Sequence, residues 1–245
     1  MAEGDQIAPM RWWGWGDPAH PPGLPASALE FLAETVGLAA RPRPPVALSN
    51  VRLPAPIRAD EAFAQMRTIV GERNVRDDHG ERVAHAAGKG YPDLVRLRAG
   101  EPLGAPDAVV TPASSQEIAA LLSLCARESL AVVPFGGGTS VVGGVEPLRG
   151  EHRGVISLDM RRMREALALD EASRTVTVQG GMRAPALERW LGERGLTLGH
   201  YPQSFEYVSL GGCAATRSAG QASSGYGAIE RMVQGLRVAA PVGEI

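Results

Sequence analysis

The sequence predicts an α+β protein with two α/β subdomains and an N-terminal helical and extended arm. Residues 107–158 alternate strand, helix, strand, glycine-rich loop and strand, and residues 167–194 fit a hairpin followed by a helix. The order of elements changes near Asp159. We therefore assign 103–159 and 160–245 to two subdomains of one domain, and 1–102 to the arm.

The composition is that of a globular protein. The 245 residues are 44% apolar and carry a formal net charge of −2, which gives no indication of a nucleic-acid partner. No apolar run approaches the ~20 residues that cross a bilayer, and the first residues lack the features of a signal peptide. The only cysteines, Cys125 and Cys213, argue against a disulfide framework or cysteine metal site and favour the reducing cytoplasm.

The arm contains three tryptophans and two expected helices. Residues 10–16 read M-R-W-W-G-W-G, and we interpret them as a hydrophobic latch on a core. Apolar residues at helical spacing predict helices over Ser27–Val36 and Asp60–Val70, the second with one buried face. Residues 74–104 are polar and irregular, and their two histidines, His79 and His85, are expected at the surface.

The first subdomain begins with a strand over Asp107–Thr111. Ser114 and Glu117 form a capping box for a helix whose buried face is Ile118, Leu121, Leu122 and Cys125. Strands are expected over Leu130–Val133 and Gly154–Leu158.

The second subdomain begins with a hairpin that pairs 167–169 with 175–178, and a helix over Ala184–Arg194 follows. Residues 199–227 show no sustained periodicity although they hold several glycines and aromatic residues. A structureless stretch of this length in a compact domain is usually functional or disordered, and the aromatics favour a backbone that wraps a ligand. Met232–Ala239 is expected to be a strand, followed by a turn at 241–243.

The most informative stretch is Pro134–Gly144, which reads P-F-G-G-G-T-S-V-V-G-G. Successive glycines allow backbone N–H groups to converge and cradle a phosphate or diphosphate. A flexible linker is the alternative interpretation. The loop lacks the lysine of a P-loop, and Val141 occupies the third position of the dinucleotide fingerprint, which requires glycine or alanine. No strong helix pattern follows it, so the residues alone indicate an anion-cradling loop and a second ligand segment.

Several motifs in order give a more specific indication. P-F-G-G-G-T-S at 134–140, Q-S-F-E-Y-V-S at 203–209 and T-R-S-A at 216–219 resemble the FAD-binding domain of the vanillyl-alcohol oxidase / p-cresol methylhydroxylase (PCMH-type) flavoproteins. Within that family the chain is similar to the alkyldihydroxyacetonephosphate synthases and their bacterial relatives. M-R-W-W-G-W-G at 10–16 and R-V-A-H-A-A-G-K-G-Y at 82–91 extend the resemblance over almost the whole chain.

The resemblance implies a PCMH-type FAD-binding fold and a set of cofactor contacts. The first loop would hold the FAD diphosphate through backbone N–H groups, and the other two segments would line the cofactor, with Arg217 a nearby cation that could balance the diphosphate charge. The expected FAD-binding residues are Pro134, Phe135, Gly136, Gly137, Gly138, Thr139, Ser140, Gln203, Ser204, Phe205, Glu206, Tyr207, Val208, Ser209, Thr216, Arg217, Ser218 and Ala219. Some relatives attach the flavin through a histidine in the first loop. Gly138-Thr139 stands there in this chain, so we expect non-covalent FAD and no metal.

The resemblance also implies a function and a limit. Family members are about twice as long as this chain. The chain has no counterpart of their last flavin-contacting segment, of their substrate domain or of the catalytic residues in that domain. We therefore name no catalytic residue and expect the second subdomain to be incomplete. The implied activity is exchange of an acyl for an alkyl group on dihydroxyacetone phosphate, in ether lipid synthesis. Alternatives are an FAD-linked 2-hydroxy-acid oxidase or dehydrogenase and a non-catalytic FAD-binding module. A small or lipid-like substrate and a homodimer are the expected partners.

Overall fold

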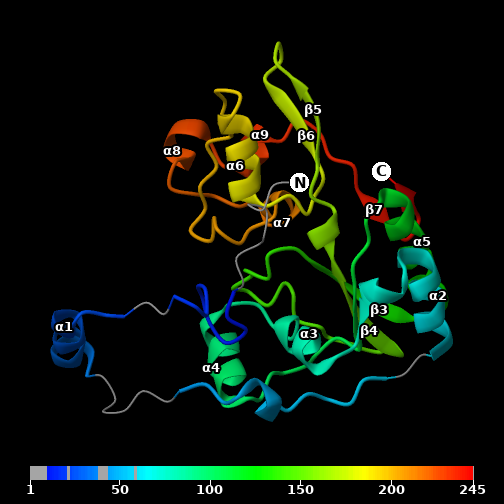
Figure 1. Cartoon of the computed structure of the whole chain (residues 1–245), viewed down its shortest axis with the longest axis horizontal. Coiled ribbons are helices and arrows are strands. Elements are labelled where there is room, and N and C mark those ends of the chain that lie inside the picture. The colour runs from blue at the N-terminus through cyan, green and yellow to red at the C-terminus, as the bar shows by residue number, and fades with distance from the viewer. Residues whose placement is uncertain (1–9, 21–22, 38–43, 58–59, 245) are drawn as a thin grey trace.

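The computed structural model describes residues 10–20, 23–37, 44–57 and 60–244, and Figure 1 shows a sheet-containing lobe and a second lobe built on a long hairpin. The helices are α1 (Ala26–Val36), α2 (Asp60–Val70), α3 (His79–Ala84), α4 (Tyr91–Ala99), α5 (Ser115–Arg127), α6 (Ala184–Gly192), α7 (Leu210–Ala215), α8 (Ser223–Tyr226) and α9 (Ile229–Met232). The strands are β1 (Val75–Arg76), β2 (Ala108–Val110), β3 (Leu130–Phe135), β4 (Gly154–Asp159), β5 (Ala166–Asp170), β6 (Thr175–Val178), β7 (Ala239–Ala240) and β8 (Gly243–Glu244).

The first lobe is a four-stranded sheet in the order β1-β2-β4-β3. β2 and β3 run parallel to β4, and β1 runs antiparallel to β2. Every residue of β4 is buried, as expected for a central parallel strand. Phe135 pairs with Asp159 at the ends of β3 and β4, so the loops that follow both strands leave from the same edge of the sheet.

Helix α5 confirms its sequence prediction. The Ser114 side chain accepts from the Glu117 N–H at 3.1 Å, and the Glu117 carboxylate accepts from the Ala113 N–H at 2.7 Å. Ile118, Leu121 and Cys125 are buried against the sheet as expected, together with Leu124, while Leu122 is half-buried. α2 adds Phe63, Met66 and Val70 to the same apolar cluster, and Ala239 of β7 returns the chain to it.

The second lobe has its own apolar cluster. It includes Leu187 and Leu191 of α6, Leu210 and Cys213 of α7, and Ile229 of α9. The β5–β6 hairpin stands beside α6 in Figure 1 and contributes half-buried residues to this cluster. The division into subdomains near Asp159 stays a prediction: the second cluster draws only on residues from Ala166 onward, but the first cluster also contains Met163 and Ala239.

Two expectations about local structure are wrong. Residues 74–104 hold two helices: Asp78 caps α3, and a left-handed Gly100 ends α4. These capping residues were not recognised in the sequence because many charged residues surround them. Met232–Ala239 is not a strand, since 233–238 have no pairing among the described residues. α1 forms as expected, and none of its residues is buried in the described structure.

The tryptophan latch expectation is confirmed in part. Trp12 is half-buried and packs against a third small cluster that includes Ala86, Ala87 and Leu97. Within the described ranges, no helix has both the length and the apolar character needed to span a membrane. Both cysteines are free and buried.

Candidate functional site

The glycine loop leaves the sheet directly after Phe135 at the end of β3. Residues 136–153 contain no helix or strand, so within this stretch the loop backbone itself supplies the donors. Within the described chain, none of the five N–H groups from Gly136 to Ser140 donates a hydrogen bond. The Ser140 hydroxyl accepts from the Gly144 N–H at 3.0 Å and fixes the far end of the loop. A run of unpaired donors of this kind suits an anionic ligand.

The second segment lies directly against this loop. A Cβ at Gly136 would overlap the Ser209 hydroxyl, and a Cβ at Gly137 would overlap the Tyr207 carbonyl oxygen. Gly138 has a φ of +66°, a left-handed conformation that favours glycine. Close backbone contact requires glycine at 137, turn geometry favours glycine at 138, and Gly136 leaves room for the Ser209 hydroxyl. The flexible-linker interpretation is therefore wrong for this part of the loop.

Arg183 joins the two segments. It immediately precedes α6, and its guanidinium donates from Nη1 to the Tyr207 carbonyl and from Nη2 to the Gly136 carbonyl at 3.2 Å. Burial lowers the pKa of Arg183, and the nearby Asp159 carboxylate opposes that shift. Because Arg183 takes the carbonyl of Gly136, the N–H of the same peptide plane, on Gly137, points the opposite way. Sequence reasoning missed Arg183, since nothing in its local pattern distinguishes it from other arginines of the chain.

The remaining residues of the second segment have mixed surroundings. Phe205 and Val208 pack in the apolar cluster of the second lobe, whereas Gln203 and Glu206 are exposed. Ser209 is buried, caps α7 and accepts from the Gly212 N–H at 3.3 Å. The structure thus brings the carboxyl-terminal part of the segment to the loop and uses its apolar side chains for packing.

The third segment lies at the other end of α7. The Ser218 hydroxyl lies 3.2 Å from Nε2 of His200, which is buried and has a pKa lowered by that burial. The exposed Arg217 guanidinium forms an ion pair with Glu230 at 3.4 Å, and Thr216 hydrogen bonds within α7. The third segment is therefore connected to the first loop through α7 and the second segment.

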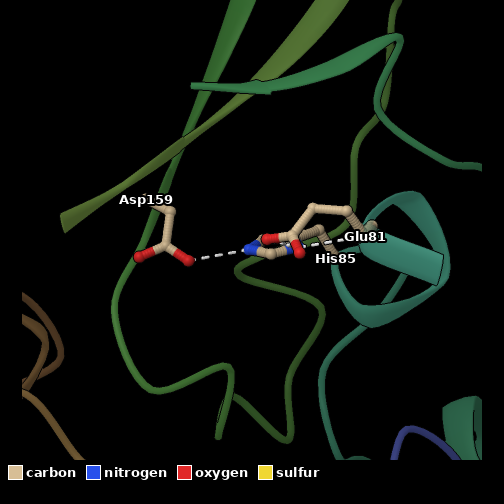
Figure 2. A group of neighbouring side chains, drawn as sticks. All are labelled: Glu81, His85 and Asp159. Carbon is tan, nitrogen blue, oxygen red and sulfur yellow. Dashed lines mark hydrogen bonds and ion pairs between the residues drawn. The ribbon is translucent and has the colours of Figure 1, made fainter. Parts of the chain in front are cut away.

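A buried polar cluster lies beside the loop, and it overturns one expectation. His85 is 2% exposed, not at the surface, while His79 is exposed as expected. Figure 2 shows His85 between Glu81, one helical turn away, and Asp159 at the end of β4; its Nε2 lies 2.8 Å from the Asp159 carboxylate. The His85 ring also lies 4.1 Å from the ring of Phe135. The spacing of Glu81 and His85 on one helical face was the available sequence signal.

Arg161 completes the cluster and explains how it is tolerated. Its guanidinium donates to the Asp159 carboxylate at 2.6 Å and to the Glu81 carboxylate. Burial of Asp159 opposes ionisation, but hydrogen bonds from His85 and Arg161 outweigh it and lower the pKa of Asp159. Glu81, His85 and Asp159 are residue types that ligate metals, and their ligand atoms lie within 4.8 Å of one another. In this structure the cation held between the two carboxylates is the Arg161 side chain.

Comparison with known proteins identifies the family. A family model described as an FAD binding domain matches residues 106–245, more than half of the chain. The chain belongs to this FAD-binding domain family. The match contains the first loop, the second segment and the third segment, and FAD is the cofactor of the domain.

Individual relatives agree with this assignment. The chain is 35% identical to an alkyldihydroxyacetonephosphate synthase of Trypanosoma brucei brucei over 98% of its own length and 43% of the relative. A solved alkyldihydroxyacetonephosphate synthase matches with a TM-score of 0.87 at 32% identity, over 96% of this chain and 48% of that one. A p-cresol methylhydroxylase structure shares the fold, with a TM-score of 0.53 at 15% identity over 64% of this chain and 29% of that one. The PCMH-type fold is therefore confirmed, and the chain spans less than half of the synthases it matches.

Proposed function

We propose that this FAD-binding domain holds its cofactor non-covalently, with the diphosphate on the backbone N–H groups of Gly136 to Ser140. The observation that carries this proposal is the unpaired run of donors in a loop whose glycines pack against Tyr207 and Ser209. An FAD diphosphate carries about two negative charges, which such a nest and the nearby Arg183 would offset. The second and third segments, 203–209 and 216–219, would line the rest of the cofactor.

The non-covalent attachment follows from the residues of the loop. Glycine and threonine at 138 and 139 offer no nucleophilic ring nitrogen to the flavin. His85 is close to Phe135, but its Nε2 is occupied by Asp159, and its Nδ1 lies 2.8 Å from the Glu81 carbonyl. Acid precipitation of the flavin-loaded protein should therefore release the flavin to the supernatant, and flavin that stays with the pellet would contradict this attachment.

We propose alkyldihydroxyacetonephosphate synthase activity for the longer protein of which this domain forms a part. The support is similarity over nearly the whole chain to proteins of that name. Bound FAD supplies a ring that takes up and returns electrons, and the protein supplies orientation and electrostatics. The residues in this chain bind and orient the cofactor, while the substrate contacts and the catalytic residues are assigned to the part of the relatives that the chain does not match.

The alternatives make different predictions for the longer protein. A synthase exchanges the acyl group for a long-chain alcohol without an added electron acceptor. A 2-hydroxy-acid dehydrogenase would turn over only when an acceptor is present, and a non-catalytic module would do neither. We also propose a cytoplasmic protein and a homodimer, which fractionation and analytical ultracentrifugation would check.

The direct test of the cofactor proposal uses this chain. The purified protein, titrated with FAD, should quench flavin fluorescence in a saturable way and show a flavin absorption band after gel filtration. Riboflavin, which lacks the diphosphate, is the matched control ligand and should bind much more weakly. Equal affinity for riboflavin and FAD would contradict the diphosphate cradle, and absence of binding would contradict the proposal as a whole.

A further inference from the structure

Residues 10–20, which alone are called the arm below although the sequence assigned 1–102 to it, are attached to the rest of the structure by a buried lysine. Lys89 is 6% exposed, and its Nζ donates to the carbonyls of Arg11 at 2.9 Å and Trp12 at 3.1 Å. Lysine is rarely buried without partners, because removing an ammonium from water is costly. The carbonyls of Arg11 and Trp12 supply those partners, so the lysine holds the arm at these two residues.

The same lysine residue contacts the glycine loop through its backbone. The Lys89 N–H donates to the Ser140 carbonyl at 2.6 Å. A Cβ on Gly88 would overlap that carbonyl oxygen, and a Cβ on Gly90 would lie 2.9 Å from the Val141 carbonyl oxygen. The G-K-G sequence at 88–90 therefore packs tightly on the loop and places the lysine side chain under the arm.

The arm also reaches the second segment. The Trp15 ring lies 6.5 Å from the Tyr207 ring, at an interplanar angle of 52°. Burial raises the pKa of the Tyr207 phenol, the carboxylates of Asp17 and Glu206 raise it further, and the Arg11 guanidinium opposes them. Arg11 closes the arm on itself by donating to the carbonyls of Asp17 at 2.9 Å and His20 at 3.1 Å. The charged groups of the arm thus face the tyrosine whose carbonyl packs on Gly137.

We propose that the arm is a strap that positions the cofactor site, with Lys89 holding it on the first loop and Trp15 supporting Tyr207 of the second segment. The inference rests on the proposed function, because the ligand that the site takes is FAD. A loop held in its binding conformation before the ligand arrives avoids the entropic cost of ordering on binding. Detachment of the arm should therefore weaken FAD binding even though the arm lies outside residues 106–245 that match the family model. The competing interpretation is that the arm only covers the small apolar cluster under Trp12.

A pair of tryptophan variants separates these two interpretations. Trp15→Leu removes the ring that faces Tyr207, whereas Trp13→Leu removes a ring of the same arm that packs on the guanidinium groups of Arg11 and Arg98. FAD affinity is measured by fluorescence titration, and the melting temperature is measured without FAD. We expect Trp15→Leu to weaken FAD binding about tenfold and Trp13→Leu by less than twofold, with similar melting temperatures for the two FAD-free variants. Equal FAD affinities for the two variants would contradict the strap.

Lys89→Met tests the attachment itself. Three of the four tryptophans of the chain lie in the arm, so iodide quenching of tryptophan fluorescence reports arm docking without FAD. Lys89→Met should increase iodide quenching and weaken FAD binding about tenfold. Increased quenching with wild-type FAD affinity would overturn the proposal, as would a variant whose arm stays protected. A wild-type chain that binds no FAD would contradict the proposed function, whereas wild-type binding with unaffected variants would contradict the strap alone.

Discussion

The Arg183 side chain connects the first loop with the second segment by hydrogen bonds. Its two hydrogen bonds go to backbone carbonyls of Gly136 and Tyr207, so it orients peptide groups and leaves the N–H groups of the loop available. Hydrogen bonds from charged donors are worth more than neutral ones, about 1.5–3 kcal/mol each. The position of the cradle therefore depends on a residue that does not belong to any of the three sequence motifs.

Arg183→Met should weaken FAD binding about tenfold, which corresponds to about 1.4 kcal/mol. The substitution keeps the aliphatic length of the side chain but leaves both carbonyls without their donor. Arg194→Met is the matched control, because Arg194 contacts only the local Trp190 carbonyl and ring and the Glu193 carboxylate in the described structure. Isothermal titration with FAD checks both variants, and equal losses in the two would show that Arg183 has no special role.

Lys89 predicts a pH dependence. Burial lowers the pKa of Lys89 to about 8, from 10.5 for an exposed lysine. At a pH between these two pKa values, the unfolded chain binds more protons at Lys89 than the folded chain does. The contribution of Lys89 to the free energy of unfolding therefore rises from about pH 8 to pH 10.5 and is constant below about pH 8. The difference is up to about 3 kcal/mol, since one pKa unit is worth about 1.4 kcal/mol.

Urea unfolding from about pH 7.5 to pH 10.5 covers both pKa values of Lys89. The effect is measured as the difference in the free energy of unfolding between wild type and Lys89→Met. Taking the difference removes the contribution of tyrosines and other groups that titrate in both proteins. We expect the wild-type curve to rise relative to the variant curve over this interval. Parallel curves would show that the ammonium group of Lys89 is as well solvated as in the unfolded chain.

At the scale of elements, the ends of β3 and β4 organise the site. Phe135 and Asp159 pair at the same edge of the sheet; the first opens the glycine loop, and the second anchors the His85 cluster of α3. The sequence predicted both strands, because each is a short apolar run bounded by turn residues. It did not predict the contact with α3, because that helix precedes β4 by more than sixty residues and only folding brings them together.

Asp159→Asn tests how much this junction contributes to stability. The variant leaves the Arg161 guanidinium and the His85 ring facing a neutral amide in a buried place, and loss of one partner of a buried pair costs about 3–5 kcal/mol. Glu171→Gln, a change at an exposed carboxylate in the β5–β6 turn, should alter the free energy of unfolding by less than about 0.5 kcal/mol. Urea unfolding checks both, and similar small changes would show that the cluster is dispensable for folding.

At the scale of the whole molecule, the sequence predicted the fold class and most of the helices and strands of the main domain. Regular apolar spacing and caps identified α2, α5 and α6, whereas short helices such as α3 and α4 were missed because few apolar residues mark their faces. The motifs identified the loop and the segments around it. Arg183, His85 and Lys89 could not be assigned, since their roles depend on backbone carbonyls and carboxylates that are distant in sequence.

Amide NMR of the isotope-labelled chain during an FAD titration shows whether FAD binds through the backbone N–H groups of Gly136 to Ser140. We expect the largest shifts on the amides of 136–140 and smaller ones at 207–209, and we expect riboflavin to leave the loop amides nearly unchanged. Saturable FAD binding that shifts amides elsewhere and leaves 136–140 unmoved would show that the diphosphate does not lie on this loop.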